Sequence, residues 1–418
     1  MIVIGAGAAG LLAAAVAAER GRQTLLIEKN RRPGVKILMS GGTRCNLTQS
    51  TDKWGIIRAY REQGNFLHSA LAALGPADLV KLIEDEGVAT KVEETGKVFP
   101  VSNRATDVLD ALVRRLDRSG AEMALHSPVT AIQRDESGFR VDRSPRAPRE
   151  ASVSRSETTT MSAASLILTS GGQSYPGSGT TGDGYAWAAA FGHTIVPPRP
   201  ALVPLTTDAP WVRDLSGITI PDVAASLYAP ENWKSLDQRR GSLLFTHFGL
   251  SGPVILDISR TVTAAADPRI LELACDFLPG IKPEQLDAQI RETCSRDGKK
   301  QIAAILAPEL PRRLVEQLIQ LAGLPTELKA AELSKKGRAD LIAVLKSARI
   351  PLTGTRGFAK AEVTAGGVAL SEIDSRTMQS KLVPGLYFAG EILDLDGPIG
   401  GYNFQSAFST GYLAGMHA

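Results

Sequence analysis

The sequence predicts an α/β fold in which one domain is interrupted by an insertion, and three observations support this prediction. A glycine-rich turn at residues 5–10 separates a short apolar run from a longer apolar stretch. Alternating apolar residues punctuated by prolines begin near residue 194, and helical periodicity follows over 282–349. Strand patterns and glycines return after residue 357. This order predicts a discontinuous Rossmann-like domain that carries an inserted β-rich domain and a helical subdomain.

The N-terminal residues follow the order of a strand, a turn, a helix and a second strand. An apolar run precedes the GxGxxG motif at residues 5–10, and the second strand ends at Glu28. In this motif Gly5 permits the tight turn, Gly7 lets a pyrophosphate approach the backbone, and Gly10 lets the helix pack on the strand. Glu28 stands 18 positions after Gly10, where an acidic side chain accepts hydrogen bonds from an adenosine ribose. This context predicts a dinucleotide site, and the motif alone fits FAD or NAD.

Small and hydrogen-bonding side chains dominate residues 36–48, which is typical of a loop wrapped around a polar ligand. Lys36 and Arg44 are candidates to neutralise phosphate groups. Cys45 has two interpretations, a nucleophilic or redox thiol and a small residue packed beside the ligand. No histidine or second cysteine lies near it in the sequence, so we favour the packing role.

Composition excludes several classes of protein. Hydrophobic residues make up 43% and charged residues 22% of the 418 residues, as in ordinary globular proteins. The three cysteines are scattered without a CxxC pair, so we expect no metal site and no dithiol centre, and their low count suits a reducing cytoplasm. Apolar runs stay shorter than about 18 residues, so we expect no membrane span. A formal net charge of +3 neither requires nor excludes an RNA partner.

A resemblance to a known family rests on the run KxLxSGGxRCNxT at residues 36–48, which follows the N-terminal GxGxxG. The run resembles the bacterial NAD(P)/FAD-dependent oxidoreductases. That family includes aminoacetone-oxidase-type and bile-acid ene-reductase-type flavoproteins and a flavoenzyme that makes dihydrouridine in ribosomal RNA. The resemblance implies bound FAD, with NAD(P)H as a transient reductant. The family has glycine at the position of Thr43, which would be strained at positive φ, and we expect the loop to tolerate the threonine.

Further motifs extend the resemblance over residues 1–415. They are GGxSYPxxGxTGDGY from Gly171, the pair Gly390-Glu391 and the run GGYN from Gly400. The resemblance also implies that Val129 contacts the adenine through its backbone. Together with the glycine motif and Glu28, these motifs predict the following cofactor-binding residues: Gly5, Gly7, Ala8, Ala9, Gly10, Glu28, Lys29, Lys36, Ser40, Gly41, Gly42, Arg44, Cys45, Asn46, Thr48, Val129, Ser170, Gly171, Gly172, Asp183, Gly390, Glu391, Asp394, Gly400, Gly401, Tyr402 and Asn403.

A second GxGxxG match, at residues 177–182, follows Ser-Tyr-Pro instead of a strand. We therefore reject it as a dinucleotide motif, because the strand before the glycines is part of the signal. Without a second strand-bound motif, the sequence argues against a dedicated NAD(P) domain. NAD(P)H would then bind only transiently, at the face of the flavin.

The segment FTHFGLSGP at residues 245–253 has a near-identical counterpart in the family. Its His247 is one of five histidines in the chain and has two interpretations. A lone histidine is often a satisfied structural residue, whereas a histidine beside a flavin donates a proton or anchors the substrate. We take His247 as the candidate catalytic residue.

Two segments outside these motifs have an unusual composition. Residues 143–162 are rich in Ser, Thr, Arg and Pro, which predicts a solvated surface loop inside a strand hairpin rather than an RNA contact. Residues 282–349 carry 13 Lys or Arg against 9 Asp or Glu. This surplus has two interpretations, a solvated helical cap and a face that contacts phosphates.

We expect the N-terminal part of the FAD-binding domain at 1–193, a β-rich domain at 194–281, a helical insert at 282–349 and the returning strands at 350–418. The favoured function is an NAD(P)H-linked reductase that passes hydride from flavin N5 to a conjugated C=C, in a small enone or in a uracil ring of structured ribosomal RNA. The alternatives are an amine oxidase that uses oxygen and a non-catalytic FAD-bound module that senses redox state or contacts RNA. We expect a cytoplasmic location and make no prediction of oligomeric state.

Overall fold

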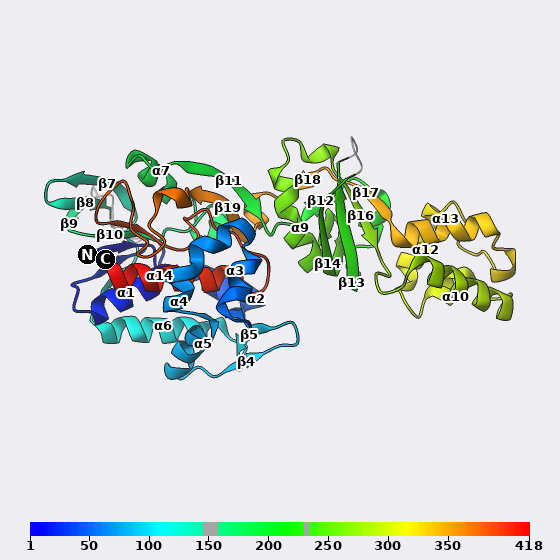
Figure 1. Ribbon diagram of the computed structural model, residues 1–418, viewed down its shortest axis with the longest axis horizontal. Helices are drawn as coiled ribbons and strands as arrows, with labels where there is room; N and C mark the ends of the chain where they lie inside the picture. Colours follow the sequence, from blue (N-terminus) through cyan, green and yellow to red (C-terminus); the bar gives the residue numbers. More distant parts are fainter. Residues whose placement is uncertain (145–157, 230–233) are drawn as a thin grey trace, which may run out of the picture. The chain divides into compact units, whose positions relative to one another are not determined.

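The structure is a computed structural model of the chain, and it describes residues 1–144, 158–229 and 234–418 (Figure 1). These residues form two compact units. Unit 1 consists of Met1–Arg199 and Val363–Ala418, and unit 2 consists of Pro200–Glu362. Unit 1 therefore contains residues from both ends of the chain, as a discontinuous domain requires. The segment boundaries expected after residues 193, 281 and 349 remain predictions.

The core of unit 1 is a parallel sheet with the strand order β20-β10-β1-β2-β6. The central strand β1 has parallel partners on both sides, with Val3 opposite Ile167 of β10 and Leu26 of β2. Parallel strands are covered on both faces, which explains why the residues of β1 are all apolar. The strands are β1 (Ile2–Ile4), β2 (Leu25–Ile27), β6 (Glu122–Ala124), β10 (Leu166–Leu168) and β20 (Leu386–Phe388).

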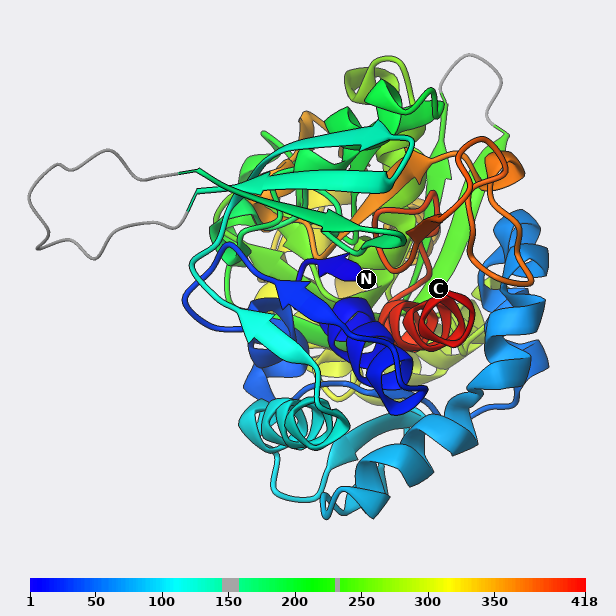
Figure 2. The same ribbon diagram turned by 90° about the vertical axis from the view of Figure 1, so that its left-hand side faces the viewer.

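Helices from the two ends of the chain pack against each other in unit 1. α1 (Ala8–Glu19) and α14 (Tyr402–His417) lie side by side, as the blue and red helices in Figure 2 show. A Cβ atom at Gly411 would overlap the backbone of Ala9, and one at Gly415 would lie 2.5 Å from the carbonyl oxygen of Ala13. Glycines on α14 and alanines on α1 therefore bring the two backbones into direct contact.

The other elements of unit 1 surround this core as further helices and small sheets. The helices are α2 (Val35–Thr43), α3 (Lys53–Ala59), α4 (His68–Ala73), α5 (Pro76–Asp85), α6 (Ala105–Ser119) and α7 (Asp183–Ala190). The small sheets have the orders β3-β5-β4, β7-β8-β9 and β11-β19. Their strands are β3 (Thr48–Gln49), β4 (Thr90–Val92), β5 (Lys97–Pro100), β7 (Val129–Asp135), β8 (Gly138–Arg143), β9 (Thr159–Ala163), β11 (Ile195–Ala201) and β19 (Val363–Val368).

Strand β9 corrects the prediction of a surface loop over residues 143–162. β9 pairs antiparallel with β8, so that Arg143 lies opposite Thr159 and Phe139 lies opposite Ala163. Met161 and Ala163 pack against the hydrophobic core, and this packing overrides the polar average of the segment. The rest of the expected loop, residues 145–157, lies outside the described residues.

Unit 2 is built on an antiparallel sheet with the order β17-β16-β13-β14-β15-β12-β18. One hydrophobic cluster joins Leu273 of this sheet to Leu314 and Leu345 of the helical segment, so the β-rich and helical segments share a core. The strands are β12 (Leu205–Thr206), β13 (Thr219–Tyr228), β14 (Ser235–Thr246), β15 (Gly249–Ser251), β16 (Glu272–Asp276), β17 (Ala348–Pro351) and β18 (Gly354–Thr355). The helices are α8 (Pro210–Asp214), α9 (Pro253–Ala264), α10 (Pro283–Arg296), α11 (Ile302–Leu306), α12 (Arg312–Leu321) and α13 (Lys335–Lys346).

One stretch of unit 1, Arg61–Asp85, is apolar and long enough to span a membrane by length and composition. It is not a single regular helix, because Leu74 leaves helical geometry between α4 and α5, with a φ of −148°. The carbonyl oxygen of Leu74 accepts hydrogen bonds from Gln405 Nε2 (3.0 Å) and Ser409 Oγ (2.7 Å) of α14. These contacts are typical of a segment in the protein core, and a core segment can meet the same criteria of length and composition as a membrane helix.

A buried histidine also joins the two parts of unit 1. His193, between α7 and β11, is 4% exposed. Its Nδ1 lies 3.0 Å from Glu372 Oε2, and its Nε2 lies 2.8 Å from Ser380 Oγ. Burial lowers the pKa of His193, and the hydrogen bond to Glu372 opposes this effect only in part. A neutral ring therefore donates from Nδ1 to Glu372 and accepts the Ser380 proton at Nε2.

This histidine predicts a loss of stability in mild acid. The folded pKa lies below the ordinary value of 6.5, so the unfolded chain binds the proton more tightly. The stabilisation is fully present above pH 6.5 and decreases as the pH falls below it. Urea unfolding at pH 7.5, 6.5 and 5.5 should show a smaller acid-induced decrease in unfolding free energy for His193→Gln than for the wild type. Equal decreases in both proteins would contradict this assignment.

Candidate functional site

The glycines of the first strand–turn–helix unit have separate roles in the structure. Gly5 has a φ of +104°, and a Cβ atom there would lie 2.6 Å from the carbonyl oxygen of Thr169. A Cβ atom at Gly10 would overlap the backbone of Gly5. A Cβ atom at Gly7 would meet no atom within 4 Å. Gly5 and Gly10 thus keep the turn tight, while Gly7 leaves the open space that a pyrophosphate needs.

The N-termini of α1 and α14 both lack side-chain caps. Gly7 caps α1 and Gly401 caps α14, and neither helix has a side-chain cap or an acidic residue in its first turn. The contacts of Gly411 with Ala9 and of Gly415 with Ala13 show that the two helices run parallel. In this register α14 begins eight residues before α1, or about 12 Å at 1.5 Å per residue. Such a pair of N-termini fits an elongated ligand with negative charge.

Glu28 is held rigidly beside the glycine turn. It follows β2 and is 8% exposed. Its Oε2 accepts a hydrogen bond from the N–H of Ala6, and its Oε1 accepts one from the N–H of Asn30, both at 2.8 Å. Each carboxylate oxygen keeps a further lone pair for ribose hydroxyls. The N–H of Ser127 donates to the carbonyl oxygen of Glu28, which brings the start of β7 and Val129 to the same edge.

A polar network connects three segments that are distant in sequence. Lys36 Nζ lies 2.5 Å from Glu391 Oε2 and 2.6 Å from Ser174 Oγ. The Ser174 hydroxyl and the N–H of Thr364 donate to Glu391 Oε1, at 2.7 and 2.8 Å. Lys29 similarly pairs with Asp183 at 2.5 Å. Sequence reasoning missed Ser174 and Thr364 as members of this network, although Ser174 lies in the motif GGxSYPxxGxTGDGY.

The segment 36–48 begins as a helix, which corrects the prediction of a loop over its whole length. α2 starts at Val35 and is broken at Ser40, where ψ is 152°, because Gly41 and Gly42 follow in left-handed geometry. Thr43 continues this geometry with a φ of 70°. A β-branched residue is strained there by about 1–2 kcal/mol, so the loop tolerates Thr43 at a conformational cost.

Arg44 and Cys45 have partners that restrict their chemistry. The Arg44 guanidinium lies 3.9 Å from the centre of the Phe99 ring and 2.6 Å from Glu93 Oε1, so a carboxylate already balances its charge. Cys45 is fully buried, and burial raises the pKa of its thiol to about 12. A neutral buried thiol supports the packing role of Cys45 over the nucleophilic one.

Residues 390–403 meet the N-terminal motifs in unit 1. A Cβ atom at Gly390 would lie 2.9 Å from Ala9 Cβ, and one at Gly401 would lie 2.5 Å from the backbone of Thr48. Asn403 forms two hydrogen bonds with the backbone of Gly397. The further contacts of this segment are Asn46 with Gly401, Tyr60 with Tyr402 and Gln63 with Asp394. All the predicted cofactor-binding residues therefore belong to unit 1.

His247 lies in unit 2, in the turn between β14 and β15. Its side chain is exposed, and its ring packs edge-on against Phe248 at 5.0 Å. The Arg356 guanidinium stacks on Phe248, 4.4 Å from the centre of its ring. The catalytic role of His247 remains a prediction.

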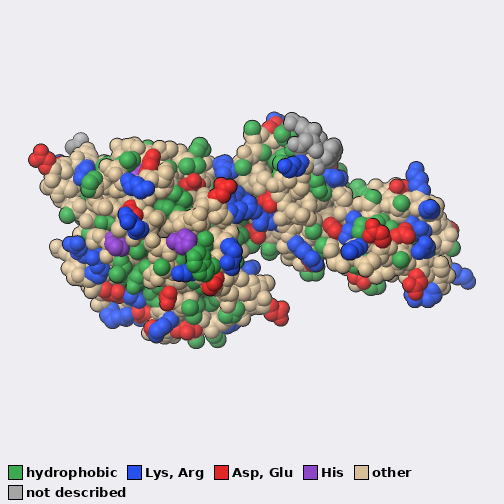
Figure 3. Space-filling model, viewed as in Figure 1, with side chains coloured by type: hydrophobic (Ala, Val, Ile, Leu, Met, Phe, Trp, Pro, Cys, Tyr) green, Lys and Arg blue, Asp and Glu red, His purple; other side chains and the backbone are tan. Residues whose placement is uncertain are grey.

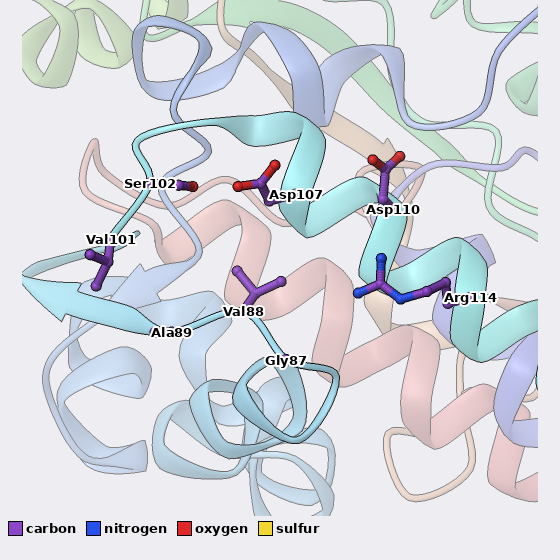
Figure 4. Close-up of a pocket in the computed structure, with 8 residues that line it drawn as sticks. All are labelled: Gly87, Val88, Ala89, Val101, Ser102, Asp107, Asp110 and Arg114. Atoms are coloured by element: carbon purple, nitrogen blue, oxygen red, sulfur yellow. The ribbon is translucent and has the colours of Figure 1, made fainter.

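A separate hollow of about 480 Å³ opens on unit 1 beside α6 (Figure 4). Asp107, Asp110 and Arg114 project from α6 at its wall, opposite the backbone of residues 87–89. Its full lining is Gly87, Val88, Ala89, Val101, Ser102, Asp107, Asp110 and Arg114. This lining includes none of the predicted cofactor-binding residues.

The strand–turn–helix cradle, the two uncapped helices and the fixed carboxylate after β2 define a dinucleotide-binding protein with a Rossmann-like fold. A 3-ketosteroid Δ1-dehydrogenase from Sterolibacterium denitrificans, solved with 1,4-androstadiene-3,17-dione, has this fold. It is similar over 100% of this chain and 98% of its own, with a TM-score of 0.52 and 14% identity. The chain belongs to the HI0933-like protein Rossmann domain family, whose model matches residues 1–417.

Two curated relatives match the chain almost from end to end. A ribosomal RNA dihydrouridine synthase of Escherichia coli K12 is 36% identical over 98% of this chain and 96% of its own length. A 3-dehydro-bile acid Δ(4,6)-reductase of Clostridium scindens is 30% identical over 100% of this chain and 98% of its own. The predictions of the family, the Rossmann-like fold and an oxidoreductase enzyme are thereby confirmed.

Gly7→Val should abolish FAD binding without unfolding the protein. The new side chain enters space that is open in the structure and that the pyrophosphate would occupy. Gly280→Val is a matched control, because a Cβ atom at Gly280 also meets no atom within 4 Å and Gly280 lies in unit 2. The absorbance of purified protein near 450 nm measures FAD content. Stoichiometric FAD in Gly7→Val would refute this placement of the phosphates.

Proposed function

We propose that this protein is an FAD-dependent reductase that uses NAD(P)H to convert a uridine of ribosomal RNA into dihydrouridine. The observation that carries this proposal is the match with the E. coli ribosomal RNA dihydrouridine synthase over 98% of the chain. A relative in Haemophilus influenzae with the same name is 34% identical over 99% of the chain. The proposed location of this activity is the cytoplasm, where ribosomal RNA is available.

The C. scindens relative supports the same class of reaction on another substrate. Its name describes reduction of C=C bonds in a bile acid with a keto group. The C5=C6 bond of uridine is likewise conjugated to a carbonyl group. Such a bond accepts hydride at the carbon distant from the carbonyl and a proton at the adjacent carbon. When bound, FAD supplies hydride transfer to an electron-poor C=C bond of this kind.

The residues of unit 1 support the binding of this cofactor. The N–H groups at the start of α1 face the open space at Gly7, where they would hold the pyrophosphate. The fixed carboxylate of Glu28 would hold the adenosine ribose. The N–H groups at the start of α14 favour negative charge, which the flavin carries when it is reduced.

One anaerobic experiment tests the proposal against the alternatives. NADH or NADPH should bleach the flavin, and ribosomal RNA that lacks dihydrouridine should restore its colour and gain dihydrouridine by nucleoside mass spectrometry. Bleaching by a primary amine, with peroxide released on admission of air, would instead support the amine oxidase. If neither NAD(P)H nor an amine bleaches the flavin, the result would support the non-catalytic FAD-bound module. If NAD(P)H bleaches the flavin and the reduced protein then reduces an enone but not RNA, the substrate would be a small enone and not uridine.

His247→Ala should slow the reduction of substrate while the reduction of flavin by NAD(P)H remains fast. Addition of hydride to C=C requires a proton, and general acid catalysis contributes about 10²–10⁴-fold. Stopped-flow measurement of the two half-reactions separates these steps. His417→Ala, at an exposed position in the last turn of α14, is the control. Equal effects on both half-reactions, or no effect on either, would make His247 a structural residue.

Several basic side chains of residues 282–349 form ion pairs with acids of the same segment. Lys300 pairs with Asp297, Arg312 with Glu316, and Arg338 with Asp287. Figure 3 shows acidic and basic side chains interspersed over this helical segment. Among the described residues, the exposed Lys299, Lys335 and Lys336 have no such partner.

Charge reversal of Lys299, Lys335 and Lys336 to Glu should therefore weaken binding of ribosomal RNA. Each phosphate contact that is lost should flatten the dependence of log K on log salt by about 0.7–0.9. Filter binding at several salt concentrations measures this slope, and FAD content should stay normal. Reversal of Lys53, Arg58 and Arg140, which are exposed basic residues of unit 1, is the matched control. A slope unchanged from the wild type would identify the segment as a helical cap.

A further inference from the structure

A buried tyrosine hydroxyl in unit 1 lacks a hydrogen-bond partner. Tyr185, in α7, is 6% exposed, and its hydroxyl oxygen has no partner among the described residues. The buried Oγ of Ser170, at the carboxyl end of β10, also lacks a partner. A buried hydroxyl without a partner is costly, and most such groups in native proteins are paired. These hydroxyls therefore indicate a ligand that supplies an acceptor.

The surroundings of the Tyr185 hydroxyl are residues predicted to bind the cofactor. A Cβ atom at Gly172 would lie 3.2 Å from the hydroxyl oxygen. A Cβ atom at Gly184, next to Tyr185, would overlap the unpaired Ser170 hydroxyl. Burial raises the pKa of Tyr185, and the negative charges of Glu391 and Asp394 raise it further. The phenol therefore stays protonated at neutral pH and acts as a donor.

The neighbouring acceptors are already engaged within the protein. Glu391 accepts from Lys36, Ser174 and the N–H of Thr364. The Oγ1 of Thr364 accepts from the N–H groups of Gln173 and Ser174, at 2.8 and 3.0 Å. These groups therefore accept hydrogen bonds from other donors, and neither accepts one from the Tyr185 hydroxyl.

We propose that the Tyr185 hydroxyl binds FAD by donating a hydrogen bond that the apoprotein leaves unmade. The proposal rests on the proposed FAD site, because Gly172, Asp183 and Glu391 place the hydroxyl among its predicted residues. It adds to that site Tyr185, which ends the motif GGxSYPxxGxTGDGY but is not among the predicted cofactor-binding residues. It also requires an unusual pattern of stability: removal of the hydroxyl harms the protein only when FAD is bound.

Tyr387 in β20 provides a matched control for this pattern. It is also buried in unit 1, at 7% exposure. Its hydroxyl donates to the carbonyl oxygen of His417 at 2.9 Å, so its hydrogen bond is complete within the chain. Tyr387→Phe should lower the melting temperature of the apoprotein and of the FAD-saturated protein by similar amounts. Tyr185→Phe should leave the melting temperature of the apoprotein unchanged or higher.

The test combines FAD titration of the apoprotein with melting curves of the apo and FAD-saturated forms. Tyr185→Phe should raise the dissociation constant of FAD about tenfold, as the loss of one hydrogen bond does, and should reduce the rise in melting temperature caused by FAD. Tyr387→Phe should leave the dissociation constant unchanged. Circular dichroism of both apoproteins verifies that they are folded.

Two results would overturn the proposal. One is an FAD dissociation constant for Tyr185→Phe equal to that of the wild type. The other is an equal loss of melting temperature in the apo and FAD-saturated forms, which would show that a buried water or a protein group pairs the hydroxyl. Failure of the wild-type apoprotein to bind FAD would instead contradict the proposed FAD site itself, so the two failures are distinguishable.

Discussion

The direct backbone contact between α1 and α14 is the interaction on which unit 1 depends. Arg20 at the end of α1 donates to the carbonyl oxygen of Gly415 across 395 positions of sequence. The contact admits no side chain at Gly411 or Gly415, since a Cβ atom at either would meet the backbone of α1. Because the helices run parallel, both N-termini point the same way. The placement of two anion-attracting helix ends thus follows from how closely two backbones pack.

The candidate site combines groups that are already satisfied with groups that are not. The carboxylates of Glu28 and Glu391 are fixed by hydrogen bonds from several segments, so their positions do not depend on a ligand. The N-terminus of α1, in contrast, has no side-chain cap, and the Tyr185 hydroxyl has no partner among the described residues. Acceptors in fixed positions together with available donors are typical of a preorganised site, which binds its ligand without extensive rearrangement.

The sequence predicted the features that depend on local pattern. The glycine turn with Glu28 and the returning strands were visible as residue types at fixed spacing. The structure differed where packing or distant partners decide the outcome. β9 forms because Met161 and Ala163 reach the core, although the segment around them is polar on average. Thr43 adopts a left-handed conformation because Gly41 and Gly42 turn the chain before it.

Partners from distant segments were hardest to predict. His193 joins Glu372 and Ser380 across some 180 positions, and no spacing rule connects a histidine to residues so far away. Ser174 lies in a motif visible in the sequence, but the contact that it shares with Thr364 at Glu391 depends on the fold. Charge counts over 282–349 likewise omitted the pairing of Lys300, Arg312 and Arg338 with nearby acids.

The discontinuity of unit 1 has a consequence for the order of events during translation. The ribosome completes Pro200–Glu362, whose core uses no residue of α14, before β19, β20 and α14 emerge. Unit 2 can therefore fold while the first half of unit 1 still lacks the helix that packs on α1. During that interval the alanines of α1 that contact α14 have no partner to pack against. Cofactor capture thus belongs to the last stage of synthesis, and a ribosome that stalls before α14 would release a folded insert on an unfinished scaffold.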